Sequence, residues 1–193
     1  MTKLQDQNNS GYPRLFFHAL AIFTIHYGAT VAVDVLEKIS TGVVKNLILQ
    51  VWAPHSASIA SGDDIELKET LLGGTKLLCE SPLSQDAEVF GHLLKALVQI
   101  ANARGVHHID VDLGDDIEER GFDTAYSKLA FCQVPDIEHD KVTQQASSFF
   151  ISSLSNLCQR HPGRYVAIIN SSLDRSETAF LASAFNTAGL SIV

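Results

Sequence analysis

The chain has 193 residues, of which 46% are hydrophobic and 19% charged, a balance that fits one globular domain and excludes a disordered chain. The formal net charge is −8 and no run of Lys and Arg is present, so we expect no nucleic-acid partner. The three cysteines, Cys79, Cys132 and Cys158, give neither a disulfide framework nor a CxxC zinc motif. They predict small buried side chains in a reducing, cytoplasmic compartment.

The N-terminal region is predicted to be helical. Residues 1–13 are polar and mixed in charge, unlike a signal peptide, and predict a flexible arm. Residues 15–36 are the most apolar run, but His18, His26 and Asp34 interrupt it and no basic cluster flanks it, which favours a buried helix and no membrane span. Within an N-terminal helical element over 14–41, residues 15–27 predict a helix. The alternation that follows leaves 29–39 open between helix and strand.

A first α/β part is predicted over residues 45–134. The apolar run at 46–53 predicts a strand. Segments 65–71 and 75–79 predict a hairpin whose turn is the glycine pair between them. A helix over 90–104 follows, because apolar residues recur there at helical spacing and would form one buried stripe. Gly105 is suited to a helix C-terminus, and residues 106–113 predict the next strand. The stripe residues are Phe90, Leu93, Leu94, Leu97, Val98 and Ala101.

A second α/β part is predicted over residues 140–193. A helix over 140–160 ends at the His161-Pro162-Gly163 sequence. The continuously apolar stretch 165–169 predicts a short buried strand. Asp174 and Glu177 have the spacing of a capping box, and the helix after them ends at Gly189. Residues 191–193 predict a terminal strand.

The alternation of helices and strands predicts a single α/β domain with a central mixed sheet flanked by helices. The C-terminal half also suggests an internal duplication of a helix-strand-helix-strand unit. Gly105 and Gly163 each precede a predicted strand, and an Ala-aromatic sequence occurs near the end of each later helix, at Ala125 and Ala184. Two successive α/β units would look alike without duplication, so both interpretations stay open.

One segment resembles a known family. The sequence from Gly91 through Leu113, followed by AYSKLAF at 125–131, resembles the core of the GCN5-related N-acetyltransferases. The resemblance covers residues 90–131 and implies an acyl-CoA-dependent transferase. It implies that acetyl-CoA binds at a turn containing Val89, Gly91 and His92. Tyr126, which matches the family tyrosine near the CoA sulfur, would be the general acid.

The segment departs from that family where phosphate would bind. Asp86 occupies the position of a Gln or Arg, and Val89 that of the first glycine. A second interpretation is therefore a non-catalytic α/β module that acts through a protein partner or as a homodimer. No G-x-S-x-G or phosphate-loop motif is present, and the eight histidines lack ligand spacing, so no metal site is expected. Whether the chain is an enzyme stays open.

Overall fold

A computed structural model of the chain describes residues 11–62, 64–107 and 145–190, and within these ranges every regular element is a helix. The predicted mixed sheet is therefore wrong for the described residues, and so is the α/β class. In chain order the helices are α1 (Gly11–Tyr27), α2 (Ala29–Ile39), α3 (Val43–Asn46), the π-helix η1 (Leu47–Trp52), α4 (Ala53–Ile59), α5 (Asp64–Glu80), the 3-10 helix η2 (Pro82–Gln85), α6 (Ala87–His107), α9 (Ala146–Arg160), α10 (Arg164–Ser172) and α11 (Arg175–Thr187).

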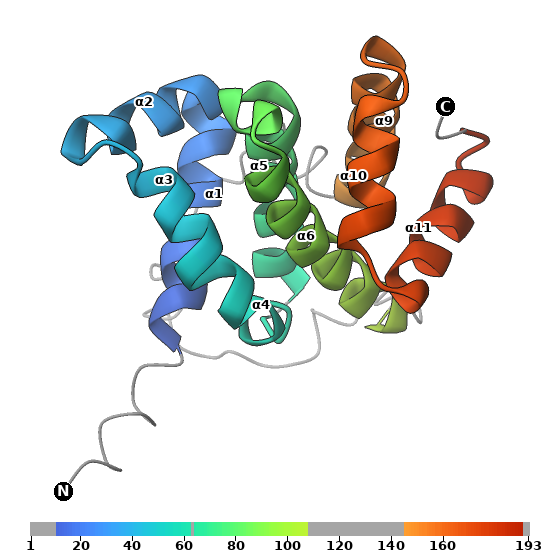
Figure 1. Cartoon of the computed structure of the whole chain (residues 1–193). Coiled ribbons are helices and arrows are strands. Elements are labelled where there is room, and N and C mark those ends of the chain that lie inside the picture. Colours follow the sequence, from blue (N-terminus) through green and yellow to red (C-terminus); the bar gives the residue numbers. More distant parts are fainter. Residues whose placement is uncertain (1–10, 63, 108–144, 191–193) are drawn as a thin grey trace, which may run out of the picture.

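The longer helices are arranged in two layers, with the N-terminal helices at one end and α9–α11 at the other (Figure 1). In one layer α5 packs between α1 and α9; in the other, α6 packs between the η1–α4 segment and α10. The central helices α5 and α6 also pack against each other and join the layers. Stacked helix pairs of this kind build α-solenoids, in which each unit buries its apolar face against its neighbours.

The core is centred on α5 and α6. The predicted stripe on α6 is confirmed, since all six of its side chains are buried. Aromatic side chains extend the core toward both ends of the stack. Phe17 of α1 meets Trp52 of η1 with ring centroids 4.5 Å apart, and Phe90 of α6 meets Tyr165 of α10 at 4.8 Å. These two ring contacts join α1 to η1 and α6 to α10.

Four predicted strand segments are helical instead. Residues 46–53 belong to the continuous helical segment formed by α3, η1 and α4, and residues 165–169 lie in α10. A short apolar run bounded by turn residues fits a buried helix as well as a buried strand, and here packing between helices decides. Residues 65–71 and 75–79 both lie in α5, and no hairpin forms. The second unit of the suggested duplication therefore lacks its strand.

The glycine pair assigned to the hairpin turn has another role. Gly73 and Gly74 lie inside α5, where a Cβ atom at residue 73 would be 2.5 Å from the Cα and backbone oxygen of Ala21. A Cβ atom at residue 74 would be 2.5 Å from Cδ2 of Leu97. The pair thus lets α5 approach α1 on one side and α6 on the other. Glycine is required most strictly at residue 73, where the close atoms belong to the backbone of Ala21.

Several helix boundaries agree with the sequence. The helix predicted over 15–27 is confirmed as α1, and the open segment 29–39 is helical, as α2. The predicted stop after residue 160 is confirmed, with Gly163 at φ 79°. The capping box is also confirmed: Glu177 N–H donates to Asp174 Oδ1 at 2.8 Å, and Asp174 N–H donates to Glu177 Oε2 at 3.0 Å. Gly105 does not end its helix, because α6 continues to His107.

The predicted arm at 1–13 is wrong for residues 11–13, which begin α1. Other predictions fall outside the described ranges: the arm over residues 1–10, the strand from residue 108 onward, the first part of the helix at 140–160 and the terminal strand at 191–193. Within the described ranges, no helix combines the length and apolarity needed to cross a membrane. No three His, Cys, Asp or Glu side chains in this part of the chain are grouped so that they could hold a metal ion.

Candidate protein-contact surface

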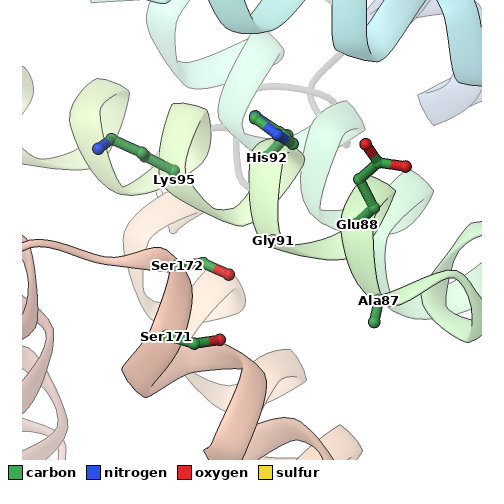
Figure 2. A pocket seen from close by; sticks show the side chains of 7 residues that line it. All are labelled: Ala87, Glu88, Gly91, His92, Lys95, Ser171 and Ser172. Carbon is green, nitrogen blue, oxygen red and sulfur yellow. The ribbon is translucent and has the colours of Figure 1, made fainter.

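The solvent-facing side of α6 carries a short polar ridge. Glu88, His92 and Lys95 follow one another at intervals of four and three residues, so they lie on one side of the helix, opposite the buried stripe. Glu88 and His92 are exposed and Lys95 is half-buried. Figure 2 shows these side chains along α6, with Ser171 and Ser172 of α10 on the neighbouring ribbon.

A hollow of about 330 Å³ lies between this ridge and the C-terminal end of α10. Its position depends on Gly91, because a Cβ atom there would overlap Ser172 Oγ. The close approach keeps α10 against α6 and leaves the hydroxyl groups of Ser171 and Ser172 at the rim. The lining residues are Ala87, Glu88, Gly91, His92, Lys95, Ser171 and Ser172.

A second hollow, of about 320 Å³, lies on the other side of the same ridge, against η1 and α4. His92 and Lys95 line both hollows and so form the wall between them. The second hollow is mostly apolar on the side of η1 and α4, where Leu49, Ala53 and Pro54 face it, with Ala96 from α6. The two hollows together give a surface with apolar and polar parts side by side.

Lys95 is held in place by a buried carboxylate. Glu177 of α11 lies 3.6 Å from the Lys95 ammonium and accepts a hydrogen bond from the Gln99 amide at 2.9 Å. Glu177 also closes the capping box at the start of α11 and is only 6% exposed. One side chain therefore fixes the start of α11 against α6 and sets the direction of the Lys95 side chain.

The N-terminus of α6 is tied to helices on both sides. The Lys45 ammonium of α3 lies 2.8 Å from Asp86 and 3.1 Å from Glu88, while Arg164 of α10 donates to the carbonyl of Gln85 at 2.8 Å. The hydrogen bond from Lys45, followed by that from the Val89 N–H, holds the pKa of Asp86 below its usual range. The Asp86 and Glu88 carboxylates in turn raise the pKa of Lys45.

The predicted site residues are distributed over different environments. His92 lies on the ridge and Gly91 lies against α10, so these two do line one hollow. Val89 is fully buried in the core. Tyr126 lies outside the described residues. Sequence reasoning missed Leu49, Ala53, Ser171 and Ser172, because it assigned Leu49, Ala53 and residues 165–169 to strands.

Comparison with known proteins decides the family. The profile of the family described as "CAS/CSE protein, C-terminus" matches residues 1–184. The chain belongs to this CAS/CSE C-terminal family. Among curated proteins it is similar to Exportin-2 of Xenopus laevis, at 26% identity, and to Exportin-2 of Homo sapiens and Danio rerio, each at 25%. These alignments cover 99% of this chain and 20% of each relative, so the chain spans about one fifth of their length. No solved structure matches.

CAS/CSE membership overturns the acetyltransferase resemblance and the acyltransferase function inferred from it. The expectation of acetyl-CoA is wrong for the same reason, and the geometry of the turn agrees. A phosphate-binding turn needs free backbone N–H groups. Here the N–H groups of Glu88 and Val89 both donate to Asp86 Oδ1, at 3.1 and 3.2 Å. The N–H of Phe90 donates to the Asp86 carbonyl oxygen at 2.9 Å.

Proposed function

We propose that this chain is a protein-binding part of an exportin-type transport receptor and acts without catalysis of its own. Membership of the CAS/CSE C-terminal family is the observation that carries the proposal. The name Exportin-2 of the relatives indicates export, and we extend that role to this chain. Such a protein would pass between the nucleus and the cytoplasm. We treat residues 1–193 as one structural unit.

The layered helices suit this role because stacked helix pairs present long surfaces to other proteins. We assign the contact to the α6 ridge and its two hollows. An apolar side chain of the partner would fit against Leu49, Ala53 and Pro54, and a carboxylate would meet the Lys95 ammonium. Each hollow has the volume of a few side chains, which suits a protein segment better than a large cofactor.

A segment exchange tests the proposal. The matching segment of Xenopus laevis Exportin-2 is replaced by this chain, and nuclear export is measured in permeabilised cells. We expect the exchanged protein to retain export that a version lacking the segment has lost. Equal export by the exchanged protein and by the version lacking the segment would contradict the proposal.

Two surface variants then test the assigned contact. His92→Glu places an additional negative charge on the ridge beside Lys95, and Ala53→Trp fills the second hollow. Both should weaken export by the exchanged protein. Arg160→Glu is the matched control, because Arg160 is exposed on α9 in the other layer. If all three variants export equally well, the surface assignment is wrong even where the segment exchange succeeds.

A further inference from the structure

The largest exposed apolar side chains are concentrated at one end of the stack. Of the seven large hydrophobic residues that are exposed within the described ranges, only Ile65 lies outside α1 and α2. Three of them, Val31, Val35 and Ile39, are spaced four residues apart along α2 and form one stripe. Their exposed fractions are 46%, 43% and 75%. We call these three residues the α2 stripe.

Helix α2 is apolar on two faces. Ala29, Ala32 and Val33 are buried, where α2 packs on α1, α3 and α5. The α2 stripe lies on another face and points to solvent. Figure 1 shows α2 at the edge of the molecule, at the end opposite α11. A surface helix normally carries polar residues on its outer face, so an apolar stripe there indicates an interface.

The charges beside the stripe identify the partner. Asp34 and Lys38 are exposed one turn apart and flank the stripe on one side, at helical angles next to Val31 and Val35. Within the part of the chain that the structure describes, neither forms an ion pair. One negative and one positive charge beside an apolar stripe are complementary to a second copy of the same helix in the opposite direction.

We infer that the α2 stripe pairs with the α2 stripe of a second copy of this chain in an antiparallel, twofold-symmetric contact. Centred on Val35, this pairing sets Val31 level with the partner's Ile39, because the two residues lie equally far from the centre in opposite directions. The twofold axis keeps the charged flanks of both helices on the same side. Asp34 then lies about 3 Å along the axis from the partner's Lys38, within reach of a lysine side chain.

Only an antiparallel pairing gives this result. In a parallel pairing the twofold axis would run along the helices, so the charged flanks of the two copies would lie on opposite sides of the contact, and Asp34 would not meet the partner's Lys38. The interface is therefore self-complementary in shape and charge in one direction alone. It involves no residue of the α6 ridge, so it is independent of the proposed transport function.

The oligomeric state of the full purified chain tests the inference, measured by light scattering and sedimentation across a dilution series. We expect a dimer that dissociates on dilution. Asp34→Lys should raise the dissociation constant by about tenfold or more, because two lysines would then meet across each contact. Lys38→Asp should do the same through paired carboxylates. The double variant Asp34→Lys with Lys38→Asp restores opposite charges across the contact and should restore the dimer.

Recovery in the double variant separates a direct contact from loss of folding, which circular dichroism also monitors. Ile65→Lys is the control, since Ile65 is exposed on α5 outside the stripe, and it should leave the dissociation constant unchanged. A chain that is monomeric at every concentration overturns the inference. So does a dimer whose dissociation constant is the same in both single variants.

Discussion

Gly73 of α5 lies against the backbone of Ala21 of α1, so the two helices meet with no side chain between them. A methyl group at residue 73 would be 2.5 Å from the Cα and the carbonyl oxygen of Ala21, and backbone atoms cannot rotate away as a side chain can. The contact fixes the separation of two helices in the same layer. The same residue therefore controls how closely the first helix pair approaches the second.

Gly73→Ala should lower the free energy of unfolding by about 1–3 kcal/mol through overpacking. This loss exceeds the gain of about 1 kcal/mol that alanine usually brings to a helix interior. Urea unfolding followed by circular dichroism measures the change. Gly91→Ala is the comparison, because its nearest neighbour is the Ser172 hydroxyl, which can change rotamer. If Gly73→Ala proves more stable than the parent chain, α1 and α5 are not in backbone contact.

Leu97→Ala should cost about 2–5 kcal/mol of unfolding free energy, because it removes buried methyl groups and leaves a cavity. Leu97 is fully buried in α6 and faces Gly74, so its neighbours cannot easily close the space. Leu15→Ala, at a 56% exposed position of α1, should change stability by less than about 0.5 kcal/mol. Equal effects of the two variants would show that the α6 stripe is not the core.

Glu177→Ala should lower the unfolding free energy by about 1.5–3 kcal/mol, the range for hydrogen bonds to a charged group. The variant removes the capping interaction of α11, the hydrogen bond from Gln99 and the ion pair with Lys95 together. Ser176→Ala is the control, because Ser176 is the exposed neighbour and makes one local hydrogen bond to Asp174. A Glu177→Ala chain as stable as the control would mean that α11 is not anchored on α6 through this carboxylate.

Acid should destabilise the chain through Asp86 and Asp174. Lys45 and the Val89 N–H lower the pKa of Asp86, and the Glu177 N–H followed by the Ser176 hydroxyl lowers that of Asp174. A lowered folded-state pKa gives stability that is complete above the unfolded value of about 3.9. That stability is lost as the pH falls through the folded value.

Asn at either position keeps the cap but cannot titrate. Melting temperatures of Asp86→Asn and Asp174→Asn should therefore fall less than that of the parent chain between about pH 5 and 3. Asp34→Asn is the control, since Asp34 lies in the middle of α2 and caps no helix. Parallel melting curves for the parent and both cap variants would contradict the assigned pKa directions.

The sequence predicted α1, α6 and α11, but it was wrong for α5, where the glycine pair inside the helix was interpreted as a hairpin turn. The stripe from Phe90 to Ala101 repeats over three turns, which only a helix can satisfy, and the capping box before α11 is a local signal. Short segments carry no such repeat. The five apolar residues at 165–169 fit either structure, and the choice depends on α6 and α9, against which α10 packs.

The candidate surface was predictable only in part. His92 and Gly91 were singled out, although for a cofactor that the family excludes. The hollows need α4 and α10 as walls, and both segments were predicted in other forms. The resemblance to acetyltransferases arose because an amphipathic helix and its aromatic end satisfy packing rules that many families share. The sequence could have indicated the ridge of Glu88, His92 and Lys95, because their spacing on a predicted helix places them on one face.

The wall that separates the two hollows has a mechanical consequence. His92 and Lys95 belong to both, so an occupant that pushes either side chain aside to enlarge one hollow narrows the other. Lys95 has little freedom to move, since the Glu177 carboxylate lies 3.6 Å from its ammonium and restrains it. Two partner segments bound in the two hollows would therefore compete through His92 and Lys95 without contacting each other. Tighter binding of the first segment would leave a smaller volume for the second.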